Sequence, residues 1–289
     1  MKKCLQCNER FGDPGWKCPR CGFAPESKNG RWIFAPELSL QNDGFHVEDF
    51  ELLSRAERDH FWFQSRNRLI LWAIRRFFPG TPDFFEIGCG NGYVLEWLEK
   101  KEPRLALSGS EVYGSALDYA GQRLEKTTLF QMDARKIPFD NEFNLIGAFD
   151  VLEHIKEDET VLTQMYQAVK KGGGVILTVP QHKFLWSDSD KFSFHYRRYE
   201  ADELRGKVEK AGFVFVAMSS FVSLLLPFML VSRWMSKGKI KEIGPKVELE
   251  IAPILNFVFK RVLDIERALI RMGLRLPFGG SLLLIAKKI

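Results

Sequence analysis

The fold is decided by the stretch Phe84-Phe85-Glu86-Ile87-Gly88-Cys89-Gly90-Asn91-Gly92. Its first residues form the apolar run of a buried strand, three glycines follow, and residues 93–98 begin an amphipathic helix. Glycines let the backbone turn sharply and approach a ligand closely. A helix start offers unpaired N–H groups and the positive end of a dipole. The stretch therefore predicts a site for an adenosine-type cofactor.

Strands and helices alternate around this stretch over residues 81–220. We expect strands at 83–87, 105–110, 128–132, 143–149, 174–179 and 213–218, and helices at 93–100, 114–124, 159–169 and 201–211. Such alternation predicts an α/β fold with a doubly wound, mostly parallel sheet that binds ligands at the carboxyl ends of its strands.

The composition is that of an ordinary soluble globular protein. The chain has 289 residues, 45% of them hydrophobic and 27% charged, which is enough for one α/β domain and a small appendage. A net charge of +5 permits an anionic partner without requiring one. The first residues contain no apolar signal segment, so we expect a cytoplasmic protein with reduced cysteines.

Four of the five cysteines lie at the N-terminus in two C-x-x-C pairs: Cys4, Cys7, Cys18 and Cys21. This spacing predicts a small zinc ribbon over residues 1–35, in which four thiolates hold a structural rather than a catalytic ion. A disulfide or free thiols are the alternatives, and a reducing compartment disfavours the disulfide. Residues 25–30 are interpreted as a linker.

Two acidic residues follow predicted strands at positions that suit an adenosine ligand. Glu111 comes about 20 residues after the glycine turn, where a carboxylate can accept both ribose hydroxyls. Asp133 follows the next strand and is placed to accept a hydrogen bond from an exocyclic adenine amine.

At these residues the chain resembles the class I S-adenosylmethionine-dependent methyltransferases. The matching pieces are residues 86–92, Glu111, Asp133-Ala134, residues 150–154 and residues 170–174. The resemblance implies a Rossmann-like, seven-stranded sheet over residues 45–220 and 279–289, closed by an antiparallel strand at 281–287. It implies S-adenosylmethionine as cofactor, held by Glu86, Gly88, Cys89, Gly90, Gly92, Glu111, Asp133, Ala134 and Asp150. In this assignment Glu86 and the glycine turn hold the methionine end, and Cys89 is a small turn residue rather than a nucleophile.

Methyl transfer from a sulfonium depends mainly on positioning, and it needs a general base only when the acceptor carries a proton of high pKa. The candidate bases are His154, after the fourth strand, and His195, in the long loop after the fifth. His154 could instead cap its loop, or hold a divalent ion with Asp150 and Glu153. The loop also supplies our candidate substrate residues, Trp186, Tyr196 and Arg197. In the alternative interpretation, Arg198 and Tyr199 anchor the loop to the next helix.

Helical patterns precede and follow the expected cofactor domain. In the lead-in segment, residues 45–80, the aromatic run 61–63 could line a substrate pocket or pack in the core, and we interpret Arg66 and its neighbours as a solvated face. Residues 221–278 are expected to form a helical insertion before the last strand. The uncharged run 211–232 loses six residues to a strand and contains Pro227, so it is too short to span a bilayer.

Residues 221–246 combine an apolar face with lysines at 237, 239, 241 and 246. This pattern suits peripheral contact with the inner face of a membrane or a lipid-linked acceptor. A dry contact within the chain, or between two copies, is the alternative.

The sequence thus predicts an S-adenosylmethionine-dependent methyltransferase that acts on a small-molecule or lipid- or glycan-linked acceptor, at oxygen. Two alternatives stay open: an rRNA or tRNA methyltransferase with a zinc-ribbon RNA-binding module, and a cofactor-binding module without catalysis. No concentrated basic stripe or aromatic stacking platform supports the nucleic-acid alternative. The sequence does not define the acceptor or the oligomeric state.

Overall fold

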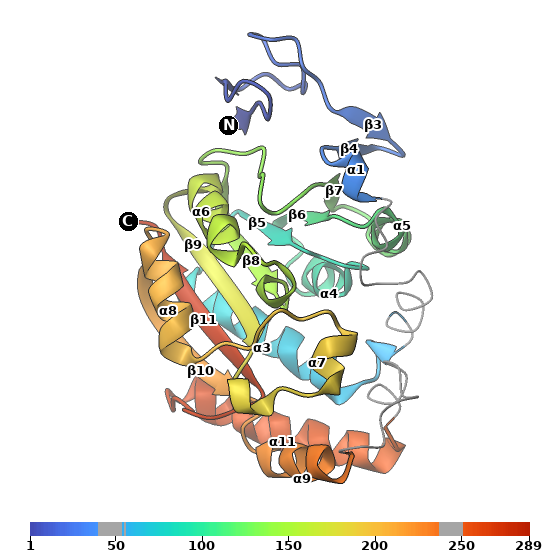
Figure 1. The fold of residues 1–289 in the computed structure, drawn as a ribbon, viewed down its shortest axis with the longest axis vertical. Helices are drawn as coiled ribbons and strands as arrows, with labels where there is room; N and C mark the ends of the chain where they lie inside the picture. Colours follow the sequence, from blue (N-terminus) through green and yellow to red (C-terminus); the bar gives the residue numbers. More distant parts are fainter. Residues whose placement is uncertain (40–53, 55, 237–250) are drawn as a thin grey trace.

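The computed structural model describes residues 1–39, 54, 56–236 and 251–289, and a nine-stranded sheet runs through it (Figure 1). The strands of this sheet are β3 (Glu26–Lys28), β4 (Arg31–Ile33), β5 (Asp83–Ile87), β6 (Ala106–Glu111), β7 (Thr128–Gln131), β8 (Phe143–Phe149), β9 (Val169–Pro180), β10 (Val214–Phe221) and β11 (Ser281–Lys287). The α-helices are α1 (Pro36–Ser39), α3 (Phe61–Phe77), α4 (Tyr93–Lys101), α5 (Gly114–Arg123), α6 (Asp158–Ala168), α7 (Asp188–Phe192), α8 (Ala201–Lys210), α9 (Leu226–Ser236) and α11 (Pro253–Arg271).

The strand order is β10-β11-β9-β8-β5-β6-β7-β4-β3. β5 pairs in parallel with β6 on one side and with β8 on the other. The direction of the connections therefore reverses between β5 and β8, and such a switch point is where open α/β sheets bind ligands. The predicted doubly wound sheet is confirmed, although β9 begins at Val169 instead of residue 174.

The last strand closes the sheet as predicted. β11 pairs antiparallel with β9 on one side and with β10 on the other. The chain between β10 and β11 therefore forms an insertion, of which the structure describes α9 and α11. The lysines at 237, 239, 241 and 246, and the first part of the lead-in segment, lie outside the described residues.

The prediction of seven strands was wrong, because residues 26–33 add β3 and β4 to the sheet. β4 pairs in parallel with β7, aligning Trp32 with Phe130, and β3 pairs with β4. The predicted linker at 25–30 was wrong for the same reason, since it contains β3. These strands cover the open edge of β7, whose backbone groups would otherwise lack partners.

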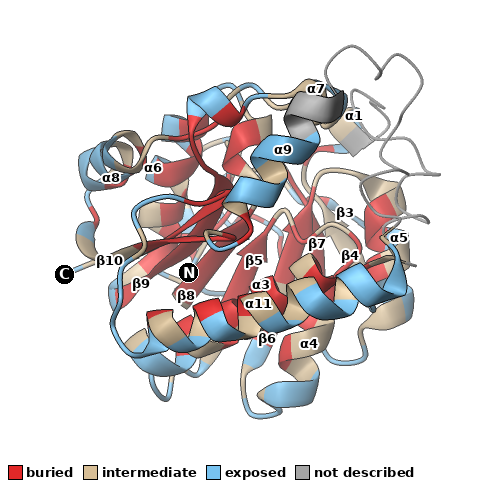
Figure 2. Ribbon diagram, turned by 90° about the horizontal axis from the view of Figure 1, so that it is seen from below, coloured by how far each residue is buried: buried red, intermediate tan, exposed pale blue. Residues whose placement is uncertain are grey.

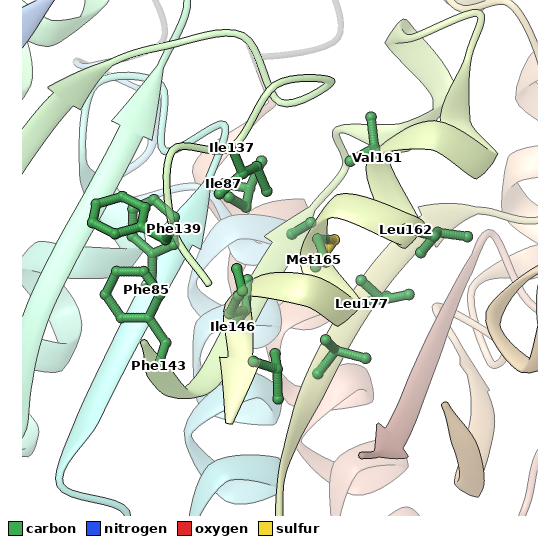
Figure 3. Packing of buried hydrophobic residues seen from close by; sticks show 14 of the residues in the cluster. Phe85, Ile87, Ile137, Phe139, Phe143, Ile146, Val161, Leu162, Met165 and Leu177 are labelled. Atoms are coloured by element: carbon green, nitrogen blue, oxygen red, sulfur yellow. The ribbon is translucent and has the colours of Figure 1, made fainter. Parts of the chain in front are cut away.

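Two apolar layers hold the helices against the sheet, and the central strands are buried on both faces (Figure 2). On one face, side chains of β5 and β8 meet those of α6, as Figure 3 shows. Phe85 stacks on Phe143 with ring centroids 4.4 Å apart. On the opposite face, α3, α4 and α11 contribute to a second cluster that includes Leu69, Ile70 and Leu98.

The cysteine-rich segment packs against the main sheet. It contains a hairpin of β1 (Lys2–Lys3) and β2 (Arg10–Phe11), and the Lys3 N–H donates to the Pro138 carbonyl at 3.0 Å. The ring of Trp16 is buried and lies edge-on to the rings of Phe34 and Phe139. The ring centroids are 4.6 Å apart for Phe34 and 5.4 Å apart for Phe139. Within the described part of the chain, no helix combines the length and the apolar character needed to cross a membrane.

Candidate active site

The glycine turn lies at the carboxyl end of β5 and leads into α4. Gly88 has a φ of +66°, and a Cβ there would lie 2.5 Å from the Val151 side chain. Any other residue would therefore be strained and would collide with the segment after β8. Gly90 has a φ of +53°, and an added Cβ would meet no atom within 4 Å, so its backbone borders open space that a ligand can approach.

Glu86 is the buried acid of the site. Its side chain is 2% exposed, and among the described residues its Oε2 atom has no hydrogen-bond partner. Burial, followed by the charges of Glu111 and Glu57, raises the pKa of the Glu86 carboxyl to about 8. A buried acceptor without a donor is costly. The free oxygen fits the cationic methionine end of S-adenosylmethionine, and this contact stays a prediction.

Glu111 ends β6 beside the same turn. Its Oε2 accepts a hydrogen bond from the Gly90 N–H at 3.0 Å, and its Oε1 accepts from the N–H groups of Val112 and Tyr113 at 2.7 and 3.2 Å. Three backbone donors thus fix the carboxylate at the rim of the turn. This arrangement fits the predicted contact with a ribose.

Asp133 and Cys89 complete the predicted cofactor set. Asp133 follows β7, where its Oδ1 accepts from the Arg135 N–H at 2.8 Å and its carboxylate pairs with the Arg135 guanidinium. The adenine contact of Asp133 and Ala134 stays a prediction. Burial raises the pKa of the Cys89 thiol well above its usual range. Cys89 is therefore a thiol at neutral pH, consistent with a turn residue.

Arg66 is a site residue that the sequence analysis missed. We interpreted it as part of a solvated face, which was wrong: Arg66 is 8% exposed and its Nη1 donates to Asp150 Oδ2 at 2.6 Å. Its guanidinium also lies 4.6 Å from the Trp62 ring centroid. The aromatic run 61–63 therefore packs around this arginine and in the core. Trp62 and Arg66 are four residues apart, a spacing that places two side chains side by side on a helix. This spacing was the only sequence signal that could have indicated their contact.

Two predicted catalytic residues, His154 and His195, lie next to each other. The rings of His154 and His195 meet edge-to-face with centroids 4.6 Å apart, although they come from separate loops. The Tyr196 N–H donates to the Glu153 carbonyl at 2.7 Å and joins these loops. Burial and the charge of His195 lower the pKa of His154 to about 3. His154 is therefore neutral at physiological pH.

Asp190 supports His195 from α7. Its Oδ1 lies 3.0 Å from His195 Nδ1 and accepts from Arg198 Nε at 2.7 Å. Burial raises the pKa of Asp190, but the hydrogen bond from His195 and the charge of Arg198 outweigh it and hold the pKa at about 2. A buried, ionised carboxylate thus orients the His195 ring. The sequence analysis did not identify this partner.

The remaining loop residues divide into anchors and exposed side chains. Tyr199 is fully buried and donates at 2.7 Å to Asp158 at the start of α6, whereas the anchoring alternative expected the next helix along the chain, residues 200–204. Arg197 Nη1 pairs with Oδ1 of the same Asp158 at 2.7 Å. Trp186 and Tyr196 are exposed. Substrate roles for Trp186, Tyr196 and Arg197 stay predictions.

The site as a whole is rich in acids. Four carboxyl groups surround the switch point between β5 and β8: those of Glu86, Glu111, Asp150 and Glu153. Arg66 forms an ion pair with one of them, Asp150. Both carboxyl oxygens of Glu153 are buried, and within the described residues they have no hydrogen-bond partner. Burial, followed by the charge of Asp150, raises the pKa of Glu153 well above its usual range. Such a site favours a cationic ligand, because a positive charge would stabilise the ionised forms.

The four N-terminal cysteines also come together. The Cys4 and Cys21 sulfurs are 3.6 Å apart, as are those of Cys7 and Cys18, and all four lie within 4.8 Å of one another. Four thiolates at about 2.3 Å from a tetrahedral ion would have similar separations. The donor set therefore fits the predicted zinc.

Comparisons with known proteins agree with this geometry. The sequence model of the methyltransferase domain family matches residues 54–218. A probable S-adenosylmethionine-dependent methyltransferase of Mycobacterium tuberculosis is 26% identical over 167 residues, 55% of this chain and 58% of that protein. The ubiquinone biosynthesis O-methyltransferase of Nitrosomonas europaea is 24% identical over 161 residues, 48% of this chain and 66% of that protein.

Among solved structures, phosphoethanolamine N-methyltransferase 2 of Haemonchus contortus, in complex with S-adenosyl-L-methionine, has a TM-score of 0.57. It is 17% identical, and the match covers 87% of this chain and 59% of that chain. At this identity the likeness establishes the fold. The family match spans more than half of the chain and contains the glycine turn, the four carboxyl groups and His154. The chain therefore belongs to the methyltransferase domain family, in its class I, S-adenosylmethionine-dependent branch.

Proposed function

We propose that this protein transfers the methyl group of S-adenosylmethionine to an oxygen atom of a small-molecule or lipid- or glycan-linked acceptor. The observation that carries the proposal is the juxtaposition of two features: an acid-rich, cation-binding turn and a histidine oriented by a buried carboxylate. The first feature suits the donor and the second suits an acceptor with a hydroxyl proton. The relatives' names include both O- and C-methyltransferases, so the choice of oxygen depends on the histidine.

On the donor side, Glu86 and the glycine turn hold the methionine end, and Glu111 and Asp133 hold the ribose and adenine. Bound S-adenosylmethionine supplies a methyl group already activated on a sulfonium. The buried carboxyl groups hold the positive charge of the donor, and the protein excludes water from the turn. Much of the acceleration then comes from positioning in a dry site.

On the acceptor side, His195 is the base and His154 is its neutral neighbour. Because the Nδ1–H of His195 donates to Asp190, its Nε2 is left as the proton acceptor. The acceptor hydroxyl would give its proton to Nε2 as the new oxygen–carbon bond forms and the methyl carbon–sulfur bond of the donor breaks, with the thioether S-adenosylhomocysteine as the leaving group. The low pKa of His154 makes it a poor base, so its role is to pack against and orient His195.

We also propose that Cys4, Cys7, Cys18 and Cys21 hold a structural zinc ion. Four protein ligands leave no open position on the metal, so the ion takes no part in methyl transfer. Reduced thiolates of this kind fit a cytoplasmic location.

Radiolabelled methyl transfer tests the proposed activity. The purified protein is incubated with methyl-labelled S-adenosylmethionine and a cell extract, which is then separated into lipid, RNA, protein and small-molecule fractions. We expect label in the lipid or small-molecule fraction, and we expect the His195→Gln variant to bind the donor but transfer little label. Label confined to RNA would overturn the proposal, as would donor binding without transfer to any fraction.

A further inference from the structure

The helices α9 and α11 form one outer surface of the molecule, at the bottom of Figure 1 and toward the viewer in Figure 2. Exposed side chains recur along α11 and its C-cap at intervals of three or four residues: Ile254, Val258, Arg261, Ile265, Ala268 and Met272. Three of the apolar ones are 78% (Ile254), 59% (Ile265) and 75% (Met272) exposed. The opposite side of α11 buries Leu263 and Ile270 against the protein, so this helix has two apolar faces.

The exposed apolar surface continues beyond α11. In α9, Phe228 and Val231 are exposed, and the Phe228 ring centroid lies 6.0 Å from that of Phe259 in α11. Exposed Phe278, shortly before β11, has its ring centroid 5.4 Å from that of His182 in the loop after β9, residues 181–199, which we call the acceptor loop. An apolar surface of this extent on a soluble protein marks an interaction site.

The charges on this surface are mostly positive. Residues 251–278 contain five basic side chains, Lys260, Arg261, Arg267, Arg271 and Arg275, and two acidic ones, Asp264 and Glu266. The two acids are already engaged. Glu266 is buried and accepts from the N–H groups of Ser223 and Leu224, and Asp264 pairs with Arg68 and Arg267. Within the described chain, Arg271 and Arg275 form no ion pair.

A groove of about 310 Å³ opens where α11 ends. Trp72 and Phe77 of α3 and Met272 form part of its apolar lining, and three arginines border it: Arg76, Arg271 and Arg275. An apolar lining beside cationic side chains fits a molecule with a hydrocarbon part and an anionic head group.

We propose that the surface formed by α9, α11 and this groove binds an anionic lipid bilayer. The apolar stripe would enter the boundary between head groups and acyl chains, and the arginines would contact the lipid phosphates. A second copy of the chain fits less well, because residues 251–278 of two copies would bring two sets of arginines together, and within that range no free acid is left to pair them. Because the ring of Phe278 contacts that of His182 in the acceptor loop, the bilayer would lie beside this loop and close to the proposed site of methyl transfer.

Vesicle flotation tests this surface with the full chain. We expect binding to vesicles that contain phosphatidylglycerol and little binding to vesicles of phosphatidylcholine alone. The double variant Ile254→Ser/Ile265→Ser should lower the partition coefficient at least about tenfold. The double variant Arg271→Ala/Arg275→Ala should lower it about 25-fold, about fivefold for each basic residue lost, and high salt should weaken binding of the unaltered protein.

The matched control is Val214→Ser, which changes an exposed apolar residue at the start of the edge strand β10, outside this surface. It should float like the unaltered protein, and all variants should keep their affinity for S-adenosylmethionine. The proposal is overturned if the protein does not bind vesicles at low salt, or if both double variants float like the unaltered protein. It is also overturned if the unaltered protein is a dimer and the substitutions convert it to monomers. The proposal does not depend on the acceptor: methyl transfer without vesicle binding would defeat this inference and leave the proposed activity intact.

Discussion

The Glu86 carboxyl group combines full burial, a pKa raised to about 8 and an oxygen without a partner among the described residues. In the free protein at neutral pH it is therefore largely protonated. A cationic ligand needs the carboxylate, so binding must release a proton. The pKa of Glu86 is higher in the folded than in the unfolded protein, so the folded state binds this proton more tightly. The free protein therefore loses stability as pH rises from about 4.5 to about 8.

We accordingly predict that S-adenosylmethionine binds more tightly as pH rises. Between pH 6 and pH 8 the dissociation constant should fall about 50-fold, because a group of pKa near 8 changes from about one per cent to half ionised. Isothermal titration calorimetry in buffers of different ionisation enthalpy would measure both the affinity and the released proton. Glu86→Gln should bind weakly and without this pH dependence; an equally steep dependence in that variant would refute the assignment.

A second prediction concerns Asp190, whose proposed role is to position His195. Asp190→Asn should lower kcat by about 10²- to 10⁴-fold, because the amide can hold the imidazole in the wrong tautomer. The dissociation constant of S-adenosylmethionine should change less than about twofold, since the donor acids are untouched. Single-turnover methyl transfer and calorimetry measure the two quantities separately. A parallel loss of donor affinity and thermal stability would indicate a purely structural role instead.

At the scale of elements, Arg66 joins α3 to the segment after β8. The ion pair with Asp150 is largely buried, with side-chain exposures of 9% and 19%. Arg66→Met removes the cation paired among the site's acids, and breaking a buried pair from one side costs about 3 kcal/mol. Urea denaturation should show this loss. The double variant Arg66→Met/Asp150→Asn should recover part of it, because no charge is then left uncompensated; additive losses would show that the pair is not coupled.

The elements that the sequence predicted well are those whose signal is local. The strands at 83–87 and 143–149 have the predicted bounds because each is a short, mostly apolar segment that is followed by turn residues. Residues whose roles depend on distant partners could not be found in this way. Arg66 resembles a surface arginine until Asp150 is placed beside it. The local sequence marks Asp190 as a capping-box residue of α7, but not as the partner of His195. Likewise, β4 is a strand because β7 offers an open edge 98 residues further along the chain, where Trp32 pairs with Phe130.

At the scale of the whole molecule, the N-terminal segment is continuous with the cofactor site. Ala35 and Gln131 exchange two hydrogen bonds, Ala35 N–H to Gln131 Oε1 at 3.0 Å and Gln131 Nε2 to the Ala35 carbonyl at 2.7 Å. The Phe34 N–H also donates to the Gln131 carbonyl at 2.8 Å. Asp133, the predicted adenine contact, lies two residues further along the chain. The four-cysteine cluster is therefore connected to the donor site through Trp16, Phe34 and β7.

The last prediction follows from this connection. Removing the proposed zinc ion with a chelator, or by Cys4→Ser, should lower Tm by about 5 °C or more, because the ion would supply folding energy to a segment with little core of its own. The affinities for S-adenosylmethionine and for adenosine should fall by the same factor, about threefold. Loss of the ion would displace β7 and with it Asp133, the proposed contact to the adenosine part common to both ligands, and would leave Glu86 in place. Scanning calorimetry, metal analysis and ligand titration measure these effects, and added zinc should reverse those of chelation.

If the chelator removes the ion without changing Tm, the cysteine cluster is not coupled to the sheet. If only S-adenosylmethionine loses affinity, the disturbance acts at the methionine end and the proposed route through Gln131 is wrong.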